Sequence, residues 1–82
     1  MQVRVLYFAV IREIVGREEE DVSLPDPVTT VAAFIAWLEE ARPELAGRMA
    51  SVRVARNECF ARAEEHLAAG DVLALIPPVA GG

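Results

Sequence analysis

The sequence predicts a small α+β domain, a mixed β-sheet with one main helix packed on one of its faces. Three observations predict it. The chain has 82 residues, the size of one domain. Short stretches near both ends have the apolar patterns of strands, and one stretch between them has apolar residues at helical spacing. We expect residues 1–76 to form the domain and residues 77–82 to form an extended C-terminal tail.

The N-terminal part of the chain predicts a hairpin of two strands. Apolar and other side chains alternate in residues 2–9, which predicts the first strand. Residues 10–15 predict a short helical turn that Gly16 closes. Residues 18–24 predict the second strand, and its acidic run, residues 18–21, is expected to be a solvated sheet edge that resists pairing with another chain.

The middle of the chain predicts the main helix. Thr29 or Thr30 has the hydroxyl group that caps a helix, and Pro43 stops the helix or starts a new turn. Trp37 is expected at the rim of the core. The apolar positions with helical spacing, which should form one buried stripe, are Val31, Phe34, Ile35, Leu38 and Ala41.

The C-terminal part predicts three more strands. Residues 52–56 alternate, residues 57–58 favour a turn, and residues 59–61 return as a strand. Residues 72–76 are apolar throughout, which is typical of a strand buried on both faces in the middle of a sheet. Placed beside the first strand, this last one forms a parallel pair. The order β-β-α-β-β-β with one helix on one face is the β-grasp, or ubiquitin-like, arrangement.

Charge and composition exclude several classes of function. The formal net charge is −5, whereas nucleic-acid binding needs a basic face. All eight basic residues are arginine, which excludes Schiff-base chemistry on a lysine. No apolar stretch approaches the ~20 residues that span a bilayer, and the N-terminus lacks the pattern of a signal peptide. We expect a soluble cytoplasmic protein without nucleic-acid or membrane partners.

Groups for catalysis or metal binding are scarce. His66 is the single histidine and Cys59 the single cysteine, so a multi-histidine metal site is excluded and no metal is expected. Nothing in their spacing supports a base and nucleophile pair. We interpret His66 as a surface residue and Cys59 as a small half-buried strand residue. Whether the chain counts as an enzyme is left open, because it lacks an evident catalytic constellation.

The C-terminal tail is the unusual feature of the sequence. Two prolines end the last strand, because they lack the N–H group that a ladder needs, and hold the chain extended. Side chains then become smaller toward the end, and six extended residues reach about 20 Å. Such a taper suits a narrow channel and leaves the terminal carboxylate accessible. The candidate working group is Gly82, on the tail Pro77, Pro78, Val79, Ala80, Gly81 and Gly82.

The tail resembles that of the small subunit of molybdopterin synthase, the MoaD family. Two further segments are similar to segments of that family: residues 3–9, and the pattern of Leu67, Gly70 and Asp71. A terminal Gly-Gly is shared with thiamine sulfur carriers and ubiquitin-like modifiers, whereas two prolines before it point to the molybdopterin branch. The resemblance covers both ends and the C-terminal third of the chain.

The resemblance implies a sulfur carrier in molybdenum cofactor biosynthesis. An E1-like adenylyltransferase would use MgATP to form an acyl-adenylate on Gly82, which sulfur converts to a thiocarboxylate. The thiocarboxylate would donate sulfur to cyclic pyranopterin monophosphate inside the large subunit of molybdopterin synthase, a sulfurtransferase. The chain would be the non-catalytic subunit of a heterotetramer with two large subunits, and it would bind no cofactor stably.

The resemblance also implies a hydrophobic partner interface on the exposed face of the sheet, at Phe8, Phe60 and Ile76. For Phe60, burial in the core is an equally good interpretation. Family members often have an aromatic residue where this chain has Ile76. Three alternatives stay open: a thiamine-type sulfur carrier, a ubiquitin-like protein modifier, and a plain interaction domain.

Overall fold

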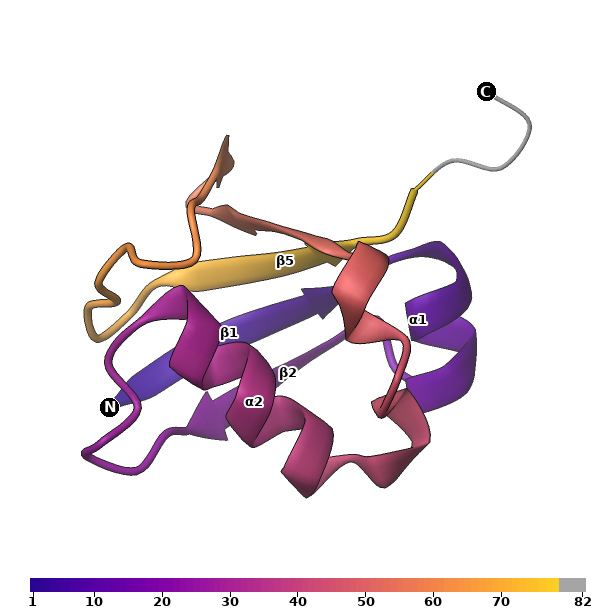
Figure 1. Cartoon of the computed structure of the whole chain (residues 1–82), viewed down its shortest axis with the longest axis horizontal. Coiled ribbons are helices and arrows are strands. Elements are labelled where there is room, and N and C mark those ends of the chain that lie inside the picture. The colour runs from indigo at the N-terminus through magenta and orange to yellow at the C-terminus, as the bar shows by residue number, and fades with distance from the viewer. Residues whose placement is uncertain (79–82) are drawn as a thin grey trace.

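The computed structural model describes residues 1–78 as one curved five-stranded sheet with its helices on one side (Figure 1). The predicted tail residues Val79, Ala80, Gly81 and Gly82 lie outside the described residues. The elements are β1 (Gln2–Tyr7), α1 (Ala9–Val15), β2 (Glu19–Ser23), α2 (Val31–Ala41), two 3₁₀ turns, η1 (Pro43–Leu45) and η2 (Met49–Ser51), then β3 (Arg53–Arg56), β4 (Cys59–Phe60) and β5 (Val72–Ile76).

The strand order is β2-β1-β5-β3-β4, and β1 and β5 are parallel neighbours in the middle of the sheet. The other neighbouring pairs are antiparallel. This topology confirms the predicted β-grasp. Because β1 and β5 run in the same direction, the N-terminus and the end of β5 lie at opposite ends of the sheet (Figure 1).

Helix α2 begins as its sequence predicts, and most of its predicted stripe packs against the core. Thr30 is the N-cap, and its hydroxyl oxygen accepts a hydrogen bond of 3.2 Å from the N–H of Ala33. Ile35 and Trp37 are partly buried against the core. Ala41 is exposed, so its predicted burial is wrong; it is the last residue of the helix, beyond the buried stripe. The residues of α2 that are fully buried are Val31, Phe34 and Leu38.

The first strand is shorter than predicted, because its expected last two residues belong to α1. Phe8 is the N-cap of that helix, and its carbonyl accepts hydrogen bonds from the N–H groups of Ile11 and Arg12. Ala9 is the first helical residue. Gly16 closes the helix with a φ of 82°, a left-handed conformation that suits glycine. The chain therefore leaves the sheet at Phe8, which places that side chain at the end of β1.

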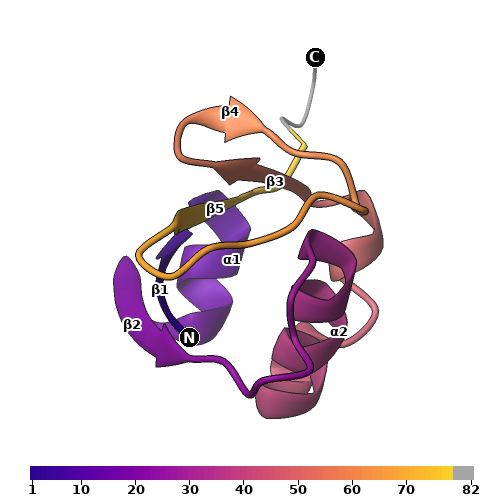
Figure 2. The ribbon, with the colours of Figure 1, turned by 90° about the vertical axis from the view of Figure 1, so that its left-hand side faces the viewer.

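The core lies between α2 and one face of the sheet (Figure 2). Alternate residues along β1 and β5 point into it, as the period of a strand requires. The fully buried residues of these two strands are Val3, Val5, Tyr7, Leu73 and Leu75. The other face of the sheet has no helix packed on it within residues 1–78.

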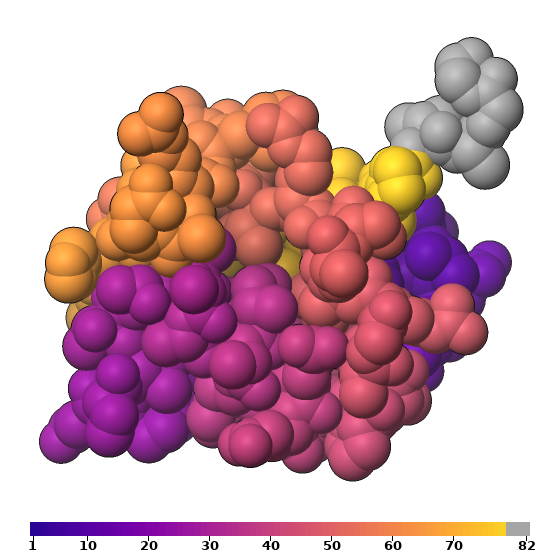
Figure 3. All heavy atoms as spheres, in the orientation of Figure 1, coloured from indigo at the N-terminus to yellow at the C-terminus, as the bar shows by residue number. Residues whose placement is uncertain are grey.

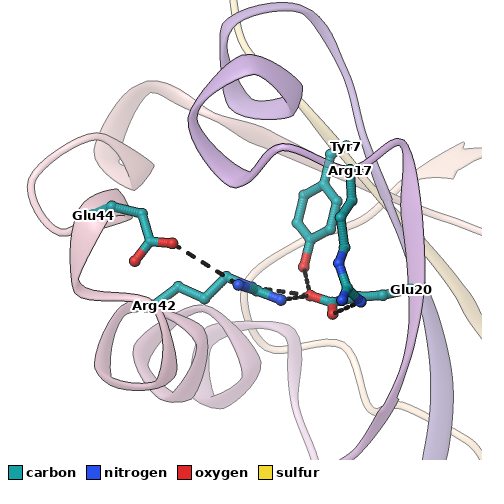
Figure 4. Close-up of polar contacts among 5 residues, drawn as sticks. All are labelled: Tyr7, Arg17, Glu20, Arg42 and Glu44. Carbon is teal, nitrogen blue, oxygen red and sulfur yellow. Dashed lines mark hydrogen bonds and ion pairs between the residues drawn. The ribbon is translucent and has the colours of Figure 1, made fainter.

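The acidic run on β2 is not wholly solvated, because Glu20 is drawn into a polar cluster beside the core (Figure 4). Its side chain is 13% exposed. The hydroxyl of Tyr7 and the guanidinium of Arg42 both donate hydrogen bonds to Oε1 of Glu20, with Arg42 Nε at 2.9 Å. Arg17 lies 3.2 Å from Oε2. The cluster joins β1 and β2 to the segment that follows α2.

The cluster keeps Glu20 ionised. Burial by itself disfavours the charged form, but hydrogen bonds from Arg42 and Tyr7 and the charges of Arg42 and Arg17 outweigh burial and lower the pKa of Glu20. Burial and the hydrogen bond to Glu20 raise the pKa of the Tyr7 hydroxyl. A neutral phenol therefore donates to a carboxylate that the arginines hold charged.

Glu20→Gln tests this cluster. We expect the free energy of unfolding at neutral pH to fall by about 2 kcal/mol, because Arg42 keeps its charge but loses its half-buried counter-charge. The pKa of Glu20 is lower in the folded than in the unfolded chain, where it is about 4.3. Its contribution is thus complete above that pH and is lost as the pH falls through the folded pKa, so the difference between wild type and variant should shrink.

The measurement is urea denaturation over a series of pH values. Glu18→Gln is the matched control from the same acidic run; the Glu18 side chain is 82% exposed, and we expect its loss to change stability by less than about 0.5 kcal/mol. Equal losses in the two variants, or a difference that does not depend on pH, would contradict the assigned role of Glu20.

Candidate functional site

The candidate site is an apolar row on the sheet face that no described helix covers. Leu6 of β1 pairs with Ala74 of β5, Ala74 pairs with Ala55 of β3, and Ala55 pairs with Phe60 of β4. Paired residues point to the same side of a sheet, so these four side chains cross four strands in one line. The row runs from near one edge of the sheet to the other.

Of the three residues predicted as a partner interface, Phe60 belongs to this row, and Phe8 and Ile76 line the same hollow as the row. Phe8 is 44% exposed and Phe60 is 55% exposed, so neither belongs to the core. Ile76 is half-buried. They line one hollow of about 570 Å³, together with Leu6, Ala55, Val72 and Ala74, and with Asn57 and Glu58. Large apolar side chains that converge on an open surface mark a site where another molecule binds.

A tight turn holds Phe60 over the hollow. Asn57 and Glu58 both have positive φ angles, 50° and 72°, as the two central residues of a type I′ turn require. Nδ2 of Asn57 donates to Asp71 over 2.9 Å, and its Oδ1 accepts from the N–H of Val72 over 2.9 Å. The hairpin of β3 and β4 is therefore fastened to the start of β5.

Asp71 is the centre of these contacts and was not predicted as a site residue; in the sequence it was noted only as part of the pattern that resembles the MoaD family. It is 5% exposed and accepts from Arg56 Nε at 2.6 Å and from the N–H of Ala68 at 2.8 Å. Burial opposes its ionisation, but the bonds from Arg56, Ala68 and Asn57 prevail and lower the pKa of Asp71. Its signal in the sequence, an aspartate after a turn glycine, is too common to indicate this role.

The root of the tail, Pro77 and Pro78, is partly packed against the domain. Strand β5 ends at Ile76, as predicted; Pro77 is buried, and Pro78 is exposed. Both prolines line a shallow groove, whose other residues come from α1 and the η2 region: Val10, Ile11, Gly47, Arg48, Ser51 and Val52. In the space-filling view the root, in yellow, emerges beside these segments (Figure 3). The hollow and the groove thus lie close to the point where the tail begins.

The described residues offer surfaces for binding. Residues 1–78 contain no group of three His, Cys, Asp or Glu side chains arranged to hold a metal ion. His66 is exposed, as predicted. Cys59 is also exposed, so its predicted half-burial is wrong; it lies on the two-residue edge strand β4, whose burial pattern is exposed throughout. Arg12, at the end of α1, lies 3.5 Å from Glu18.

The helices of the described part are all too short or too polar to cross a bilayer.

Comparison with models of protein families identifies the family of the chain. A model described as the ThiS family matches residues 5–82. The chain belongs to the ThiS family. This ThiS-family chain is 38% identical over 84 residues to the molybdopterin synthase sulfur carrier subunit of Chlamydomonas reinhardtii, with 100% of both chains covered. It is 36% identical over 86 residues to the subunit of the same name from Homo sapiens, covering 99% of this chain and 94% of the relative.

Solved structures agree on the fold. SAMP1 from Haloferax volcanii, a small archaeal modifier protein, matches with a TM-score of 0.86 and 33% identity over 100% of both chains. A complex of subunits 1 and 2 of the molybdopterin-converting factor from Helicobacter pylori contains a chain that matches with a TM-score of 0.73 and 26% identity, again over 100% of both. The resemblance to molybdopterin synthase small subunits is confirmed.

The exposure of the two phenylalanines predicts their effect on folding. We expect Phe8→Ala and Phe60→Ala to lower the free energy of unfolding by only about 1 kcal/mol each, because roughly half of each residue stays in water in the folded domain. Phe34→Ala, in the fully buried part of α2, should cost about 3–5 kcal/mol. Chemical denaturation measures all three. If Phe60→Ala lowered the free energy of unfolding about as much as Phe34→Ala, Phe60 would belong to the core, contrary to its observed exposure.

Proposed function

We propose that this ThiS-family chain is the sulfur carrier subunit of molybdopterin synthase and carries sulfur on Gly82. The observation that carries the proposal is the apolar hollow of Phe8, Phe60 and Ile76 beside the root of the tail. Full-length similarity to proteins named molybdopterin synthase sulfur carrier subunit supports it. The chain would therefore bind a partner with its open sheet face and deliver its terminus into that partner.

Gly82 needs activation before it can accept sulfur. A terminal carboxylate, with a pKa of about 3.5, is ionised and a poor electrophile at neutral pH. In the proposed reaction an oxygen of Gly82 attacks the α-phosphorus of MgATP, held by an E1-like adenylyltransferase, and pyrophosphate leaves. A sulfur nucleophile then attacks the acyl carbon, AMP leaves, and the terminus becomes a thiocarboxylate. Glycine suits both attacks, because it has no Cβ to crowd the acyl carbon.

The large subunit of molybdopterin synthase is the proposed acceptor. There the thiocarboxylate of Gly82 would transfer its sulfur to cyclic pyranopterin monophosphate. A dithiolene needs two sulfur atoms, so the carrier would dissociate and be recharged between transfers. The Helicobacter pylori complex of subunits 1 and 2 supports a partner of this kind. Two carriers and two large subunits in a heterotetramer, and the lack of a stably bound cofactor, complete the proposal.

Protein modification is a second candidate, favoured by the match to SAMP1. A modifier uses the same adenylate, but an amine of another protein attacks it and forms an isopeptide bond. The 82 residues contain no lysine, so chains through side-chain amines of the carrier itself are excluded. A thiamine-type carrier shares the thiocarboxylate and differs only in its acceptor.

The mass of the intact protein tests the proposed chemistry. We expect incubation with an E1-like enzyme, MgATP and a sulfur donor to add the mass difference between one sulfur and one oxygen, because the acyl carbon exchanges one for the other. A chain lacking Gly82 should stay unchanged in mass while remaining folded. With a competent enzyme, an unchanged mass for the full chain would overturn sulfur carriage, and larger adducts with other proteins would favour the modifier.

Binding to the large subunit tests the hollow. We expect Phe60→Ala to weaken the affinity about tenfold or more, because truncating a central aromatic residue of an interface typically removes much of its binding energy. Glu40→Ala is the control, since Glu40 is an exposed residue of α2 on the opposite side of the sheet. Calorimetric titration measures both. Equal affinities for the two variants would place the partner elsewhere.

A further inference from the structure

The arginines of the chain fall into two groups. Five of the eight lie within ion-pair distance of a carboxylate: Arg4, Arg12, Arg17, Arg42 and Arg56. Within residues 1–78, the other three have no carboxylate within 4.0 Å, and they are Arg48, Arg53 and Arg62. We call these three the uncommitted arginines. In a chain of net charge −5, arginines without a nearby carboxylate are unexpected. Two of these three lie beside the root of the tail.

Arg48 and Arg53 both lie near the root of the tail. Arg48 lines the groove that also contains Pro77 and Pro78. Arg53 pairs with Ile76, the last residue of β5, across the β3–β5 ladder. Both are exposed. Two arginines from different parts of the fold therefore lie near the start of the tail.

Arg53 is also held in place. Its guanidinium carbon lies 3.8 Å from the centre of the Phe60 ring. A guanidinium stacked on a ring keeps its full charge, and its N–H edges stay available to a carboxylate. The charge of Arg53 is thus fixed at the border of the apolar hollow, where a docked partner would meet it.

If a partner docks on this face, the charges of Arg48 and Arg53 come close to the partner's surface. An arginine that loses water without gaining a counter-charge costs binding energy, whereas an opposite carboxylate replaces the lost hydration and directs the encounter. Complementary charges at a binding site raise the association rate and do so less as salt increases. A neutral or basic partner surface at this border would be disfavoured.

We propose that Arg48 and Arg53 form a cationic pair that recognises acidic side chains around the mouth of the partner's tail channel. The inference rests on the proposed function and names the chemistry of the partner surface. The pair would act before sulfur transfer, by orienting the tail root toward the mouth of the channel. Its effect lies in the rate of association and in the choice of partner.

The experiment measures association of the full chain with the large subunit of molybdopterin synthase by stopped flow. Salt is set at about 0.1 M and about 1 M, between which the Debye length falls from about 10 Å to about 3 Å. We expect Arg48→Glu combined with Arg53→Glu to slow association about tenfold at low salt and much less at high salt. Arg53→Lys, which keeps the charge, should stay within about twofold of wild type.

Arg62→Glu is the matched control, since Arg62 is the third uncommitted arginine, is exposed, and lines neither the hollow nor the groove. We expect it to change the rate less than about twofold. A loss for Arg62→Glu or for Arg53→Lys equal to that of the double variant would overturn the proposal. Wild-type rates for the double variant would do the same and leave the proposed function intact. Failure of the wild type to bind would overturn both.

Discussion

The parallel pairing of β1 with β5 is the constraint on which the rest of the molecule depends. It joins the two ends of the chain in the middle of the sheet, with Val5 opposite Leu73 and Tyr7 opposite Leu75. Both strands contribute fully buried residues to the same core. Because the strands are parallel, the end of β1 and the end of β5 lie together. Phe8, which leaves the sheet after β1, and Pro77, which follows β5, are brought to one end of the domain for this reason.

The same pairing separates a structural face from a binding face. Successive residues of a strand point to opposite sides, so Leu73 and Leu75 pack under α2 while Ala74 and Ile76 face outward. The outward residues are apolar, yet no helix covers them within the described part of the chain. Keeping apolar side chains in water has no benefit for folding. It has one for the reversible docking that the proposed carrier function would require, since such a carrier would leave one partner and meet another.

Two polar clusters hold the surroundings of the sheet in place. The Glu20 cluster ties β2 and the segment after α2 to β1, and the Asp71 cluster ties the β3–β4 hairpin to β5. In each, a carboxylate accepts several hydrogen bonds that keep it charged. The second cluster supports the proposed interface, because it positions the turn before Phe60. Arg53 adds a stack on the ring of Phe60 from the adjacent strand.

Local patterns in the sequence were sufficient to determine the elements and their order. Alternation identified the strands, helical spacing and the Thr30 cap identified α2, and Gly16 marked the end of α1, since each depends on residues a few positions apart. Only the tertiary structure decided which of the polar residues are drawn into buried hydrogen-bonded clusters. Glu20 is recruited by Tyr7 and Arg42, and Asp71 by Arg56, over separations that no local pattern records. It also decided that β1 stops at Tyr7, that Phe60 is exposed, and that Arg48 and Arg53 both lie near the root of the tail, because folding brings distant segments together there.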